Sequence, residues 1–386
     1  MGQTTLRGGC PDFLSGILQK ICADATMVAT VYLQGETMKK FCVFSGFLGA
    51  GKTTAMMALT KYCGNAAMIS NDLGHGVELA DDRLARLEGC RSSELTETCI
   101  CYQNENLARR IDRCFQEGCE LVISDIPGFG VGALEHVYHG LSEKYPGVYE
   151  LAPFTVLVEP AAVALLRRGE TGDMAYIYHA QLAEADLIVL NKCDAIEETE
   201  RDDCLGWLGA QYPHARCIAI SARTGWGMDE LAAILRQGRA SMRRPDIGYG
   251  GAEFAAAIGK LSEYYIQYYA QVCCSEFDGT DYLLHMAQQV KAALSGTGWE
   301  IPHLKLLAWE PEGDYGKVDL VGAKRPIEIT RRFARPCTRI AVILNASGVC
   351  PGDRMRGIVT DAVEDASRAY QLEIMVFKEE CFGMGD

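Results

Sequence analysis

Short apolar runs alternate with amphipathic segments along the first 240 residues. The apolar runs are nearly continuous, which is typical of parallel strands covered on both faces, and the segments between them have helical spacing of apolar positions. The pattern predicts an α/β domain with a mostly parallel sheet. Its strands are expected at residues 39–45, 66–71, 120–125, 154–159, 186–192 and 217–221, and its helices at 53–59, 104–116, 133–144, 175–185, 197–210 and 228–237.

The pattern changes after a stretch rich in arginine, proline and glycine at residues 239–251. Such a stretch is typical of a boundary, so we expect a first domain over residues 38–240 and a second over 241–386. The second domain is predicted to begin with one long linking helix at residues 252–273, whose tyrosines repeat in i, i+4 pairs and favour core packing over a partner-binding face. A smaller α+β domain follows, with a mostly antiparallel sheet and helices on one side. Its helices are expected at residues 282–294 and 354–370, and its strands at 303–308, 317–321, 326–330, 339–344 and 373–377.

Composition narrows the class of protein without identifying a function. The chain has 386 residues, and 48% of them are hydrophobic, which suits two domains. Its net charge of −14 disfavours binding to nucleic acid or to an anionic membrane, and no apolar run reaches the length of a membrane span. The 17 cysteines, without a segment typical of a signal peptide, indicate free thiols in a reducing compartment. We expect a cytoplasmic protein with a poorly packed N-terminal extension over residues 1–37.

A glycine-rich loop joins the first predicted strand to the first predicted helix. Residues 46–53 fit the pattern G-x-x-x-x-G-K-[ST], in which backbone N–H groups and a helix N-terminus face a phosphate chain. Lys52 is expected to reach the β- and γ-phosphates, and the hydroxyl of Thr53 to bind Mg²⁺. The alternative is a simple turn, which the strand-loop-helix context disfavours. The residues expected at the phosphates are Gly46, Gly49, Ala50, Gly51, Lys52, Thr53 and Thr54.

A carboxylate ends the predicted strand at residues 120–125. Asp125 there can hold Mg²⁺ directly or through water, and the N–H of Gly128 can contact the γ-phosphate. The D-x-P-G sequence is common by itself, but its place downstream of the phosphate-binding loop (P-loop) at residues 46–53 favours this role. Asp125 completes the expected catalytic set with Lys52 and Thr53. Because Phe129 follows Gly128 where a water-orienting residue would stand, we predict slow hydrolysis that a partner, a bound metal or dimerisation accelerates.

The N-K-x-D sequence that starts at Asn191 predicts a guanine site. The carboxylate of Asp194 can accept hydrogen bonds from both N1–H and the N2 amino group of guanine, whereas adenine offers no such pair of donors. Asn191 would brace the loop, and the stem of Lys192 would lie over the base. Ser221 and Ala222 follow the next strand, where backbone N–H groups can meet guanine O6. The motifs together predict GTP or GDP with Mg²⁺, and Asp194 argues against the alternative of an ATP-using kinase or ATPase.

Cys99 and Cys101 form a third cluster. Two thiols one residue apart can share a metal such as Zn²⁺ or Co²⁺, but further ligands are required. The alternative, two structural cysteines in an apolar turn, stays open on spacing alone. The candidates for further ligands are Cys90, His75, Asp72 and Glu97.

Together these motifs resemble those of the CobW-type GTPases, relatives of the nickel-handling GTPases UreG and HypB. The resemblance covers residues 38–238, and the loop sequence G-F-L-G-A-G-K-T-T is close to a signature of the CobW branch. It implies a GTP-hydrolysing metallochaperone or maturation factor for a metalloenzyme or its cofactor, with Zn²⁺, Co²⁺ or Ni²⁺ at a C-x-C-C motif. The chain departs from that pattern because Tyr102 replaces the last cysteine, His75 stands where an acid is common, and Asp125 replaces a frequent glutamate.

Two functions of different classes remain. In the first, the protein delivers or gates a metal for a client metalloenzyme. In the second, it is a GTP-controlled interaction switch without metal cargo, which acts on a client such as a corrinoid-dependent protein or its methyltransferase. Tyr102 favours the second function, and the Cys99/Cys101 pair favours the first. In both cases the expected partner is a protein, not nucleic acid or a membrane, and the sequence leaves a homodimer open.

Overall fold

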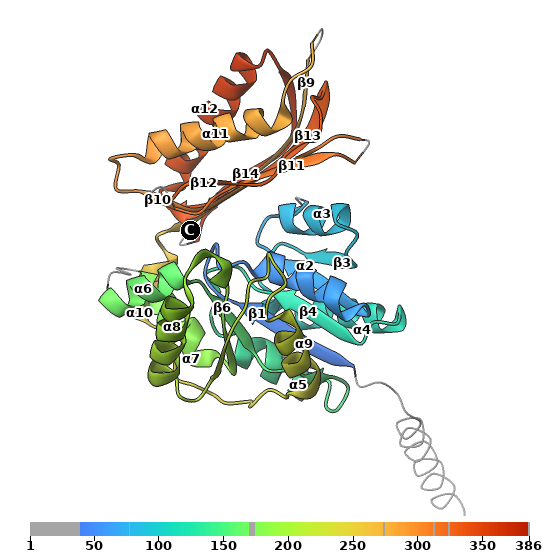
Figure 1. Ribbon diagram of the computed structural model, residues 1–386, viewed down its shortest axis with the longest axis vertical. Coiled ribbons are helices and arrows are strands. Elements are labelled where there is room, and N and C mark those ends of the chain that lie inside the picture. The colour runs from blue at the N-terminus through green and yellow to red at the C-terminus, as the bar shows by residue number, and fades with distance from the viewer. Residues whose placement is uncertain are drawn as a thin grey trace, which may run out of the picture. The chain divides into compact units, whose positions relative to one another are not determined.

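The computed structural model describes residues 39–76, 78–169, 174–272, 275–311, 313–322 and 325–384. The expected extension at residues 1–37 and the last residue of the helix predicted for 252–273 lie outside this part of the chain. The expected fold class is confirmed, because a P-loop α/β domain with a parallel sheet is followed by a domain built on an antiparallel sheet (Figure 1). Among the described residues, no helix combines the length and apolar character needed to cross a bilayer.

The first sheet is parallel, and its strands follow the order β3-β2-β4-β1-β6-β7-β8, with β5 beside β1. Every residue of β1, β2, β4, β6 and β7 is buried. Burial on both faces explains why these strands form continuous apolar runs in the sequence. The strands are β1 (Lys40–Ser45), β2 (Ala66–Asn71), β3 (Ser92–Leu95), β4 (Leu121–Asp125), β5 (Glu150–Leu151), β6 (Thr155–Val158), β7 (Leu187–Leu190) and β8 (Arg216–Ala219).

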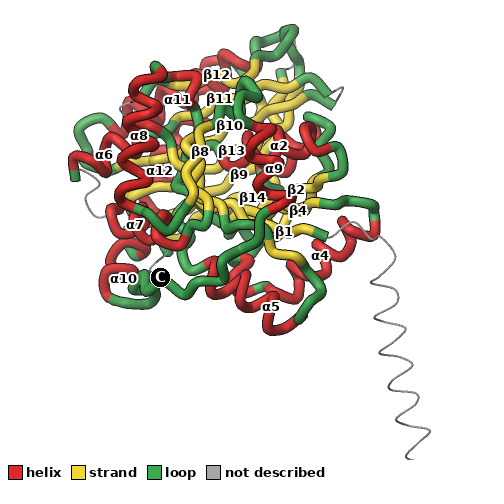
Figure 2. The backbone as a smooth tube through the Cα atoms, turned by 60° about the horizontal axis from the view of Figure 1, so that its bottom comes forward, coloured by secondary structure: helices red, strands yellow, loops and turns green. Residues whose placement is uncertain are grey.

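Helices cover both faces of this sheet. In Figure 2 the strands of the two sheets overlap at the centre, and helices lie around them. Cys42 and Phe44 of β1 pack in a cluster with α2 and α9, whereas Phe41 and Val43 pack on the opposite face with α4 to α8. A π-helical segment, Leu134–His139, leads into α5. The helices are α2 (Lys52–Cys63), α3 (Ala80–Leu87), α4 (Asn104–Gln116), α5 (Gly140–Lys144), α6 (Pro160–Arg168), α7 (Ala175–Glu184), α8 (Glu198–Gln211) and α9 (Met228–Gln237).

The second sheet is antiparallel, with the strand order β12-β11-β10-β13-β9-β14. Two long helices, α11 and α12, pack on one face of it (Figure 1). The opposite face carries polar residues that reach the nucleotide-binding domain, as described below. The elements are α10 (Ala252–Ile258), β9 (Leu261–Gln271), α11 (Gly279–Leu294), β10 (Glu300–Trp309), β11 (Tyr315–Leu320), β12 (Ile327–Arg331), β13 (Arg339–Val349), α12 (Gly352–Ala369) and β14 (Glu373–Gly383).

The prediction of one long linking helix at residues 252–273 is wrong. The helix α10 ends at Ile258, and β9 follows it and pairs with β13 and β14. Tyr264 and Tyr268 lie on the face under α11 and α12, and both are fully buried. Residues four apart share a face in a strand as well as in a helix, so the tyrosine spacing does not separate the two. Aromatic residues also favour strands. The pairing of β9 with β13 and with β14 selects the strand over the helix here.

Candidate functional site

The P-loop connects β1 to α2 with a tightly packed backbone. Gly46, Gly49 and Gly51 have φ angles of +132°, +81° and +90°, a region that favours glycine. A Cβ atom at Gly46 would lie 2.2 Å from the carbonyl oxygen of Leu157, and one at Gly51 would lie 2.4 Å from the amide nitrogen of Asn191. Only glycine therefore fits these positions, and the loop leads directly into the N-terminus of α2, where free N–H groups favour an anion.

Lys52 is the first residue of α2, and its ammonium group donates a hydrogen bond of 2.7 Å to the carbonyl oxygen of Gly46. Burial lowers the pKa of Lys52 to about 8, although Asp125 acts in the opposite direction. Thr53 and Thr54 line the same cavity, which has a volume of about 140 Å³. A phosphate in this cavity would favour the charged form of Lys52, because an opposite charge offsets the cost of burial.

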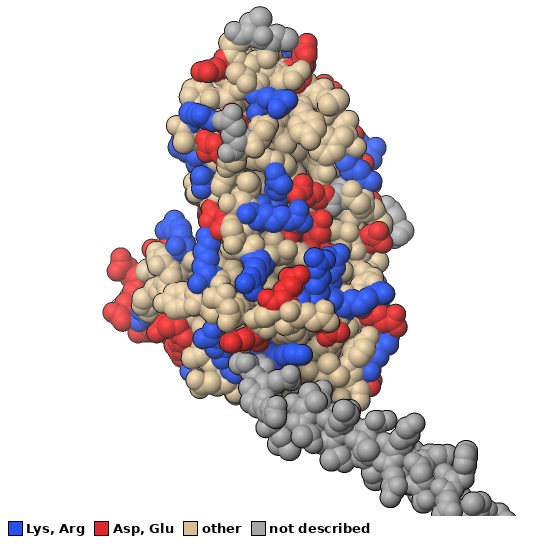
Figure 3. Space-filling model, turned by 90° about the vertical axis from the view of Figure 1, so that its right-hand side faces the viewer, with Lys and Arg blue, Asp and Glu red and all other residues tan. Residues whose placement is uncertain are grey.

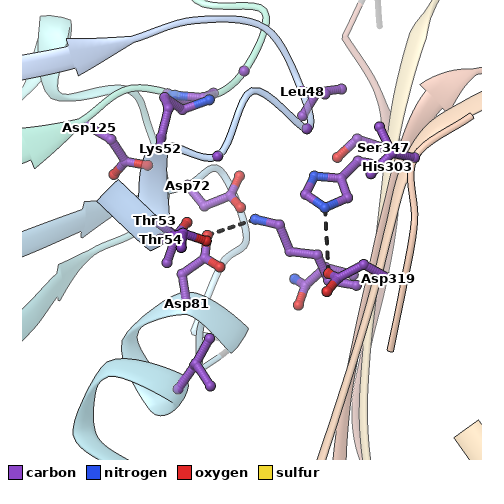
Figure 4. Close-up of a pocket in the computed structure, with 18 of the residues that line it drawn as sticks. Leu48, Lys52, Thr53, Thr54, Asp72, Asp81, Asp125, His303, Asp319 and Ser347 are labelled. Carbon is purple, nitrogen blue, oxygen red and sulfur yellow. Dashed lines mark hydrogen bonds and ion pairs between the residues drawn. The ribbon is translucent and has the colours of Figure 1, made fainter. Parts of the chain in front are cut away.

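Asp125 ends β4 at the wall of this cavity, and burial raises its pKa to about 7 against the attraction of Lys52. Asp72, at the end of β2, and Asp81, in the first turn of α3, line the cavity as well. Figure 4 shows Lys52, Thr53 and the three aspartates on one side of the cavity, with residues of the second sheet on the other. A hydroxyl and several carboxylates make an oxygen-donor set of the kind that Mg²⁺ prefers.

Asn71 joins Asp125 to the segment that carries the two cysteines. The backbone N–H of Asn71 donates to Asp125 Oδ1 at 2.9 Å, and its side-chain Oδ1 accepts from the N–H of Ile100 at 2.9 Å. Its amide group donates to the carbonyl oxygens of Leu95 and Thr98 at 3.0 Å. The backbone and the side chain of this one buried residue therefore connect the Asp125 carboxylate to the cysteine segment.

The sulfur atoms of Cys99 and Cys101 lie 3.1 Å apart. The hydrogen bond between the two thiols lowers the pKa of Cys99, and the same bond, with burial, raises the pKa of Cys101 well above its ordinary value. Tyr102, which stands in place of a third cysteine, is 69% exposed, and its hydroxyl pairs with that of Tyr249. This segment therefore offers two neighbouring thiols, and the position of the motif's third cysteine carries a tyrosine.

The structure does not bring the other candidate metal ligands to these thiols. Cys90 faces the carbonyl oxygen of Met57, His75 pairs with Glu380 at 2.6 Å, Asp72 accepts a hydrogen bond from Tyr265 at 2.7 Å, and Glu97 is exposed. In the described part of the chain, no three histidine, cysteine, aspartate or glutamate side chains converge into a metal-binding group.

Asn191 connects the predicted base site to the P-loop. Its amide group donates to the carbonyl oxygen of Ala50 at 2.9 Å, and its Oδ1 accepts from the N–H of Ala222 at 3.0 Å. Asp194 accepts a hydrogen bond of 2.6 Å from the hydroxyl of Ser221. The structure therefore brings together the loops expected at the base and the loop expected at the phosphates.

Gly128 and the residues after it are held by α7. Gln181 is buried, and its amide group donates to the carbonyl oxygens of Gly128 and Gly130 at 3.1 and 2.9 Å. Glu184 accepts from the N–H groups of Gly132 and Leu134 at 2.7 and 3.2 Å. These two side chains fix the loop that follows Asp125, and no local sequence pattern identifies them.

The sequence interpretation missed the contribution of the second sheet. Lys305 of β10 reaches Asp81 with an Nζ to Oδ2 distance of 2.6 Å. Burial acts to lower the pKa of Lys305, but the carboxylates around it, Asp81 first, raise it above its ordinary value. The only signal in the sequence is alternation along β10, where polar His303 and Lys305 are interleaved with apolar residues.

Two more residues of the second domain contact the nucleotide-binding loops. A Cβ atom at Gly49 would lie 2.4 Å from the Cγ1 atom of Val321, so this valine lies directly against the P-loop. Arg325 pairs with Glu159 at 2.7 Å, and Glu159 also pairs with Lys192 of the base loop at 3.0 Å. On the face in Figure 3, basic and acidic side chains are interspersed and do not gather into a large basic patch.

Comparison with known proteins identifies a family for the first domain. Residues 40–219 match the family model for the CobW/HypB/UreG nucleotide-binding domain. Similar solved structures include HypB from Helicobacter pylori in complex with nickel, with 16% identity, coverage of 56% of this chain and 93% of that one, and a TM-score of 0.36. They also include the Zn(II)-bound YjiA GTPase from E. coli, with 13% identity, coverage of 84% and 99%, and a TM-score of 0.35.

The hydrogenase maturation factor HypB from Archaeoglobus fulgidus is similar over 52% of this chain and 90% of its own, with 18% identity and a TM-score of 0.35. No curated protein sequence matches the chain. The match to the family model spans the P-loop, Asp125 and the N-K-x-D loop. The nucleotide-binding part of this chain, residues 40–219, therefore belongs to the CobW/HypB/UreG family.

Proposed function

We propose that the protein binds and hydrolyses GTP with Mg²⁺, and that the nucleotide cycle controls delivery of a metal to a client metalloenzyme or to the maturation of its cofactor. The observation that carries this proposal is the position of Asn191 between Ala50 and Ala222. A guanine nucleotide must be held at its phosphates and at its base together, and this side chain ties the two loops expected to do so.

In this proposal Lys52 neutralises charge on the β- and γ-phosphates, and the loop from Gly46 to Thr54 surrounds them with N–H groups. Thr53 and Asp125 would hold Mg²⁺, which supplies further charge neutralisation when bound, and Asp72 lies on the same cavity wall. Gln181 holds the Gly128 carbonyl, which fixes the peptide plane between Gly128 and Phe129 and limits movement of this loop. Asp194 would accept the N1 and N2 protons of the base.

Phe129 accounts for slow intrinsic hydrolysis. It is 4% exposed and packs with Phe47 and Leu73 in one hydrophobic cluster, so it offers no polar group to an attacking water. Cys99 packs against the same cluster. A change at the γ-phosphate that moved Phe129 would therefore reach the thiols directly, as well as through Asn71.

The thiol pair fits a soft or borderline metal such as Zn²⁺, Co²⁺ or Ni²⁺ as two of its ligands. Thiolates on tetrahedral Zn²⁺ lie about 3.8 Å apart, and the sulfur atoms of Cys99 and Cys101 are 3.1 Å apart, so a small opening of the pair suffices. Tyr102 leaves the motif with two thiols. The remaining ligands would come from water or from the client. Ligands supplied by the client would allow the metal to move from the thiol pair to the client.

The first experiment measures nucleotide binding and phosphate release with GTP and with ATP in the presence of Mg²⁺. We expect selective binding of GTP and slow release of phosphate. Turnover on the order of tens per second without a partner, at the upper range of kinases, would contradict the predicted slow hydrolysis. Selective binding of ATP would contradict the proposed guanine site.

The second experiment titrates Zn²⁺, Co²⁺ and Ni²⁺ in the presence of GDP or a non-hydrolysable GTP analogue. Cys99→Ser should weaken metal binding, and the nucleotide should change metal affinity in the wild type. Cys90→Ser is a matched control, because this thiol lies against Met57, away from the pair. If Cys99→Ser alters neither metal affinity nor GTP turnover, the metallochaperone function is wrong.

Exposure of Tyr102 favours a second candidate function. This side chain is 69% exposed and leaves only two thiols in the motif. Two thiols are fewer than a metal site requires, which favours a GTP-controlled switch without metal cargo. Binding of a corrinoid-dependent protein or its methyltransferase should in that case depend on GTP against GDP and be insensitive to Cys99→Ser. Sedimentation with each nucleotide also tests whether a homodimer forms.

A further inference from the structure

The second sheet presents a buried polar face to the P-loop cavity. On β10, Leu304 and Leu306 point into the core under α11 and α12, whereas His303 and Lys305 line the cavity. Polar groups buried in this way are stable only when they are paired. Other residues of the second sheet also line the cavity: Glu263 on β9, Lys317 and Asp319 on β11, Glu328 and Thr330 on β12, and Asn345 and Ser347 on β13.

Lys305 differs from the other basic residues of the second sheet that line the cavity, His303 and Lys317, because it is bound by an acid of the nucleotide-binding domain. Its partner is Asp81 of α3, at 2.6 Å. Lys317 is held within its own sheet by Asp319, which also lies 3.6 Å from His303. The Lys305 side chain is 18% exposed, so it keeps access to the cavity that Lys52 enters from the opposite side.

The cavity contains more acidic than basic groups from the nucleotide-binding domain. Asp72, Asp81 and Asp125 line it together with Lys52 and Lys192, and Lys305 and Lys317 contribute ammonium groups from the second sheet. A nucleoside triphosphate carries more negative charge than one Mg²⁺ ion neutralises, and its last phosphate carries much of it. At the same distance, an ammonium group is attracted more strongly to a phosphate that carries about two negative charges than to a carboxylate that carries one.

We propose that Lys305 binds the terminal phosphate of the nucleoside triphosphate, so that the second sheet supplies a cation in cis that distinguishes GTP from GDP. This inference rests on the proposed function. The ammonium group passes from Asp81 to the phosphate when the triphosphate binds and returns when it is absent. The nucleotide state thereby sets whether the ion pair between α3 and β10 is present, while the apolar contacts of Ala80 and Leu84 with the second sheet persist. This couples the terminal phosphate to the domain outside the family match.

The test compares affinities for a non-hydrolysable GTP analogue and for GDP by calorimetry, with Mg²⁺ present. Lys305→Ala should weaken binding of the analogue about 10- to 100-fold, the effect of losing a charged hydrogen bond, and leave binding of GDP within about twofold. Lys305→Arg should restore part of the difference in affinity between the analogue and GDP. Asp81→Asn releases the ammonium group and should strengthen binding of the analogue, a change opposite in sign to damage to the fold.

Lys378→Ala is the matched control, since this lysine lies on β14 of the same sheet but outside the cavity, and it should leave the affinity ratio unchanged. If Lys305→Ala loses affinity for both nucleotides equally, or loses none, the role of Lys305 is overturned while the proposed function remains intact. If the wild-type protein binds neither guanine nucleotide, the proposed function fails and this inference fails with it.

Discussion

The side-chain amide of Asn191 donates a hydrogen bond of 2.9 Å to the carbonyl oxygen of Ala50, which is 141 residues earlier in the chain. Its Oδ1 accepts from Ala222, so one side chain spans three loops. The Cβ atom that Gly51 lacks would lie 2.4 Å from the same amide nitrogen. The loop arrangement therefore depends on a small residue at position 51 and on an amide at position 191.

Asn191→Ala should weaken binding of GTP and GDP by a similar factor. The variant loses two buried hydrogen bonds that position the loops, and neither of them contacts the terminal phosphate. A loss of about 1–2 kcal/mol corresponds to roughly a 10-fold increase in both dissociation constants. Titration with fluorescent nucleotide derivatives measures the effect, and a change confined to GTP would contradict this role.

Asp194→Asn should change the base that is bound. The aspartate offers two acceptor oxygens, whereas asparagine offers one acceptor and one donor group. Guanine presents an amino group at C2 that then lacks its acceptor, whereas xanthine presents an oxygen there that suits the new donor. We expect weaker binding of GTP and stronger binding of xanthosine triphosphate in competition assays. Retained preference for GTP would place recognition of the base elsewhere.

Tyr265→Phe should destabilise the protein. Tyr265 is 1% exposed, and its hydroxyl donates to Asp72 Oδ1 at 2.7 Å, so the variant leaves a buried carboxylate with one donor fewer. The free energy of unfolding should fall by about 1.5–3 kcal/mol, measured by denaturant titration. Tyr269→Phe is the control, because Tyr269 lies on the same face of β9 but is 46% exposed, and we expect a change below about 0.5 kcal/mol.

Glu184 should make stability depend on pH. Burial raises its pKa from 4.5 to about 7, so the folded protein retains a proton that the unfolded chain has released between these values. This contribution to stability is fully present below about pH 4.5 and is lost as the pH rises to about 7. The difference in unfolding free energy between wild type and Glu184→Gln should fall by about 2–3 kcal/mol across this window.

The measurement is the denaturation midpoint of both proteins at several pH values, and the difference between them removes the contribution of other groups. Glu117→Gln, on the surface, is the matched control and should follow the wild type at every pH. A constant difference between wild type and Glu184→Gln would show that Glu184 titrates alike in the folded and unfolded chain.

The parts of the structure that the sequence predicted are those with a local cause. Buried parallel strands are apolar throughout, and a P-loop requires glycine at fixed positions, so both are visible in short segments. By contrast, β3 buries only Leu95 of its four residues, and α3 before it lies in the same unassigned stretch. These elements become recognisable only when β2 and the second sheet are in place.

The error at residues 252–273 and the omission of Lys305 have a common origin. The spacing of Tyr264 and Tyr268 is compatible with a helix and with a strand, and only pairing with β13 and β14 selects the strand. A lysine that alternates with leucines suggests a solvated face of a sheet. Its role in the cavity depends on a domain that begins far earlier in the chain, which no local pattern contains.

Val321 lies against the P-loop so closely that Gly49 has no room for a side chain. If the cavity holds a nucleotide as proposed, the lifetime of the complex would depend on movement of the second domain at this contact, because Val321 borders the phosphate cavity. A client that binds the second domain would accelerate nucleotide exchange without contacting the nucleotide. Client binding and nucleotide release would in this way become a single kinetic event.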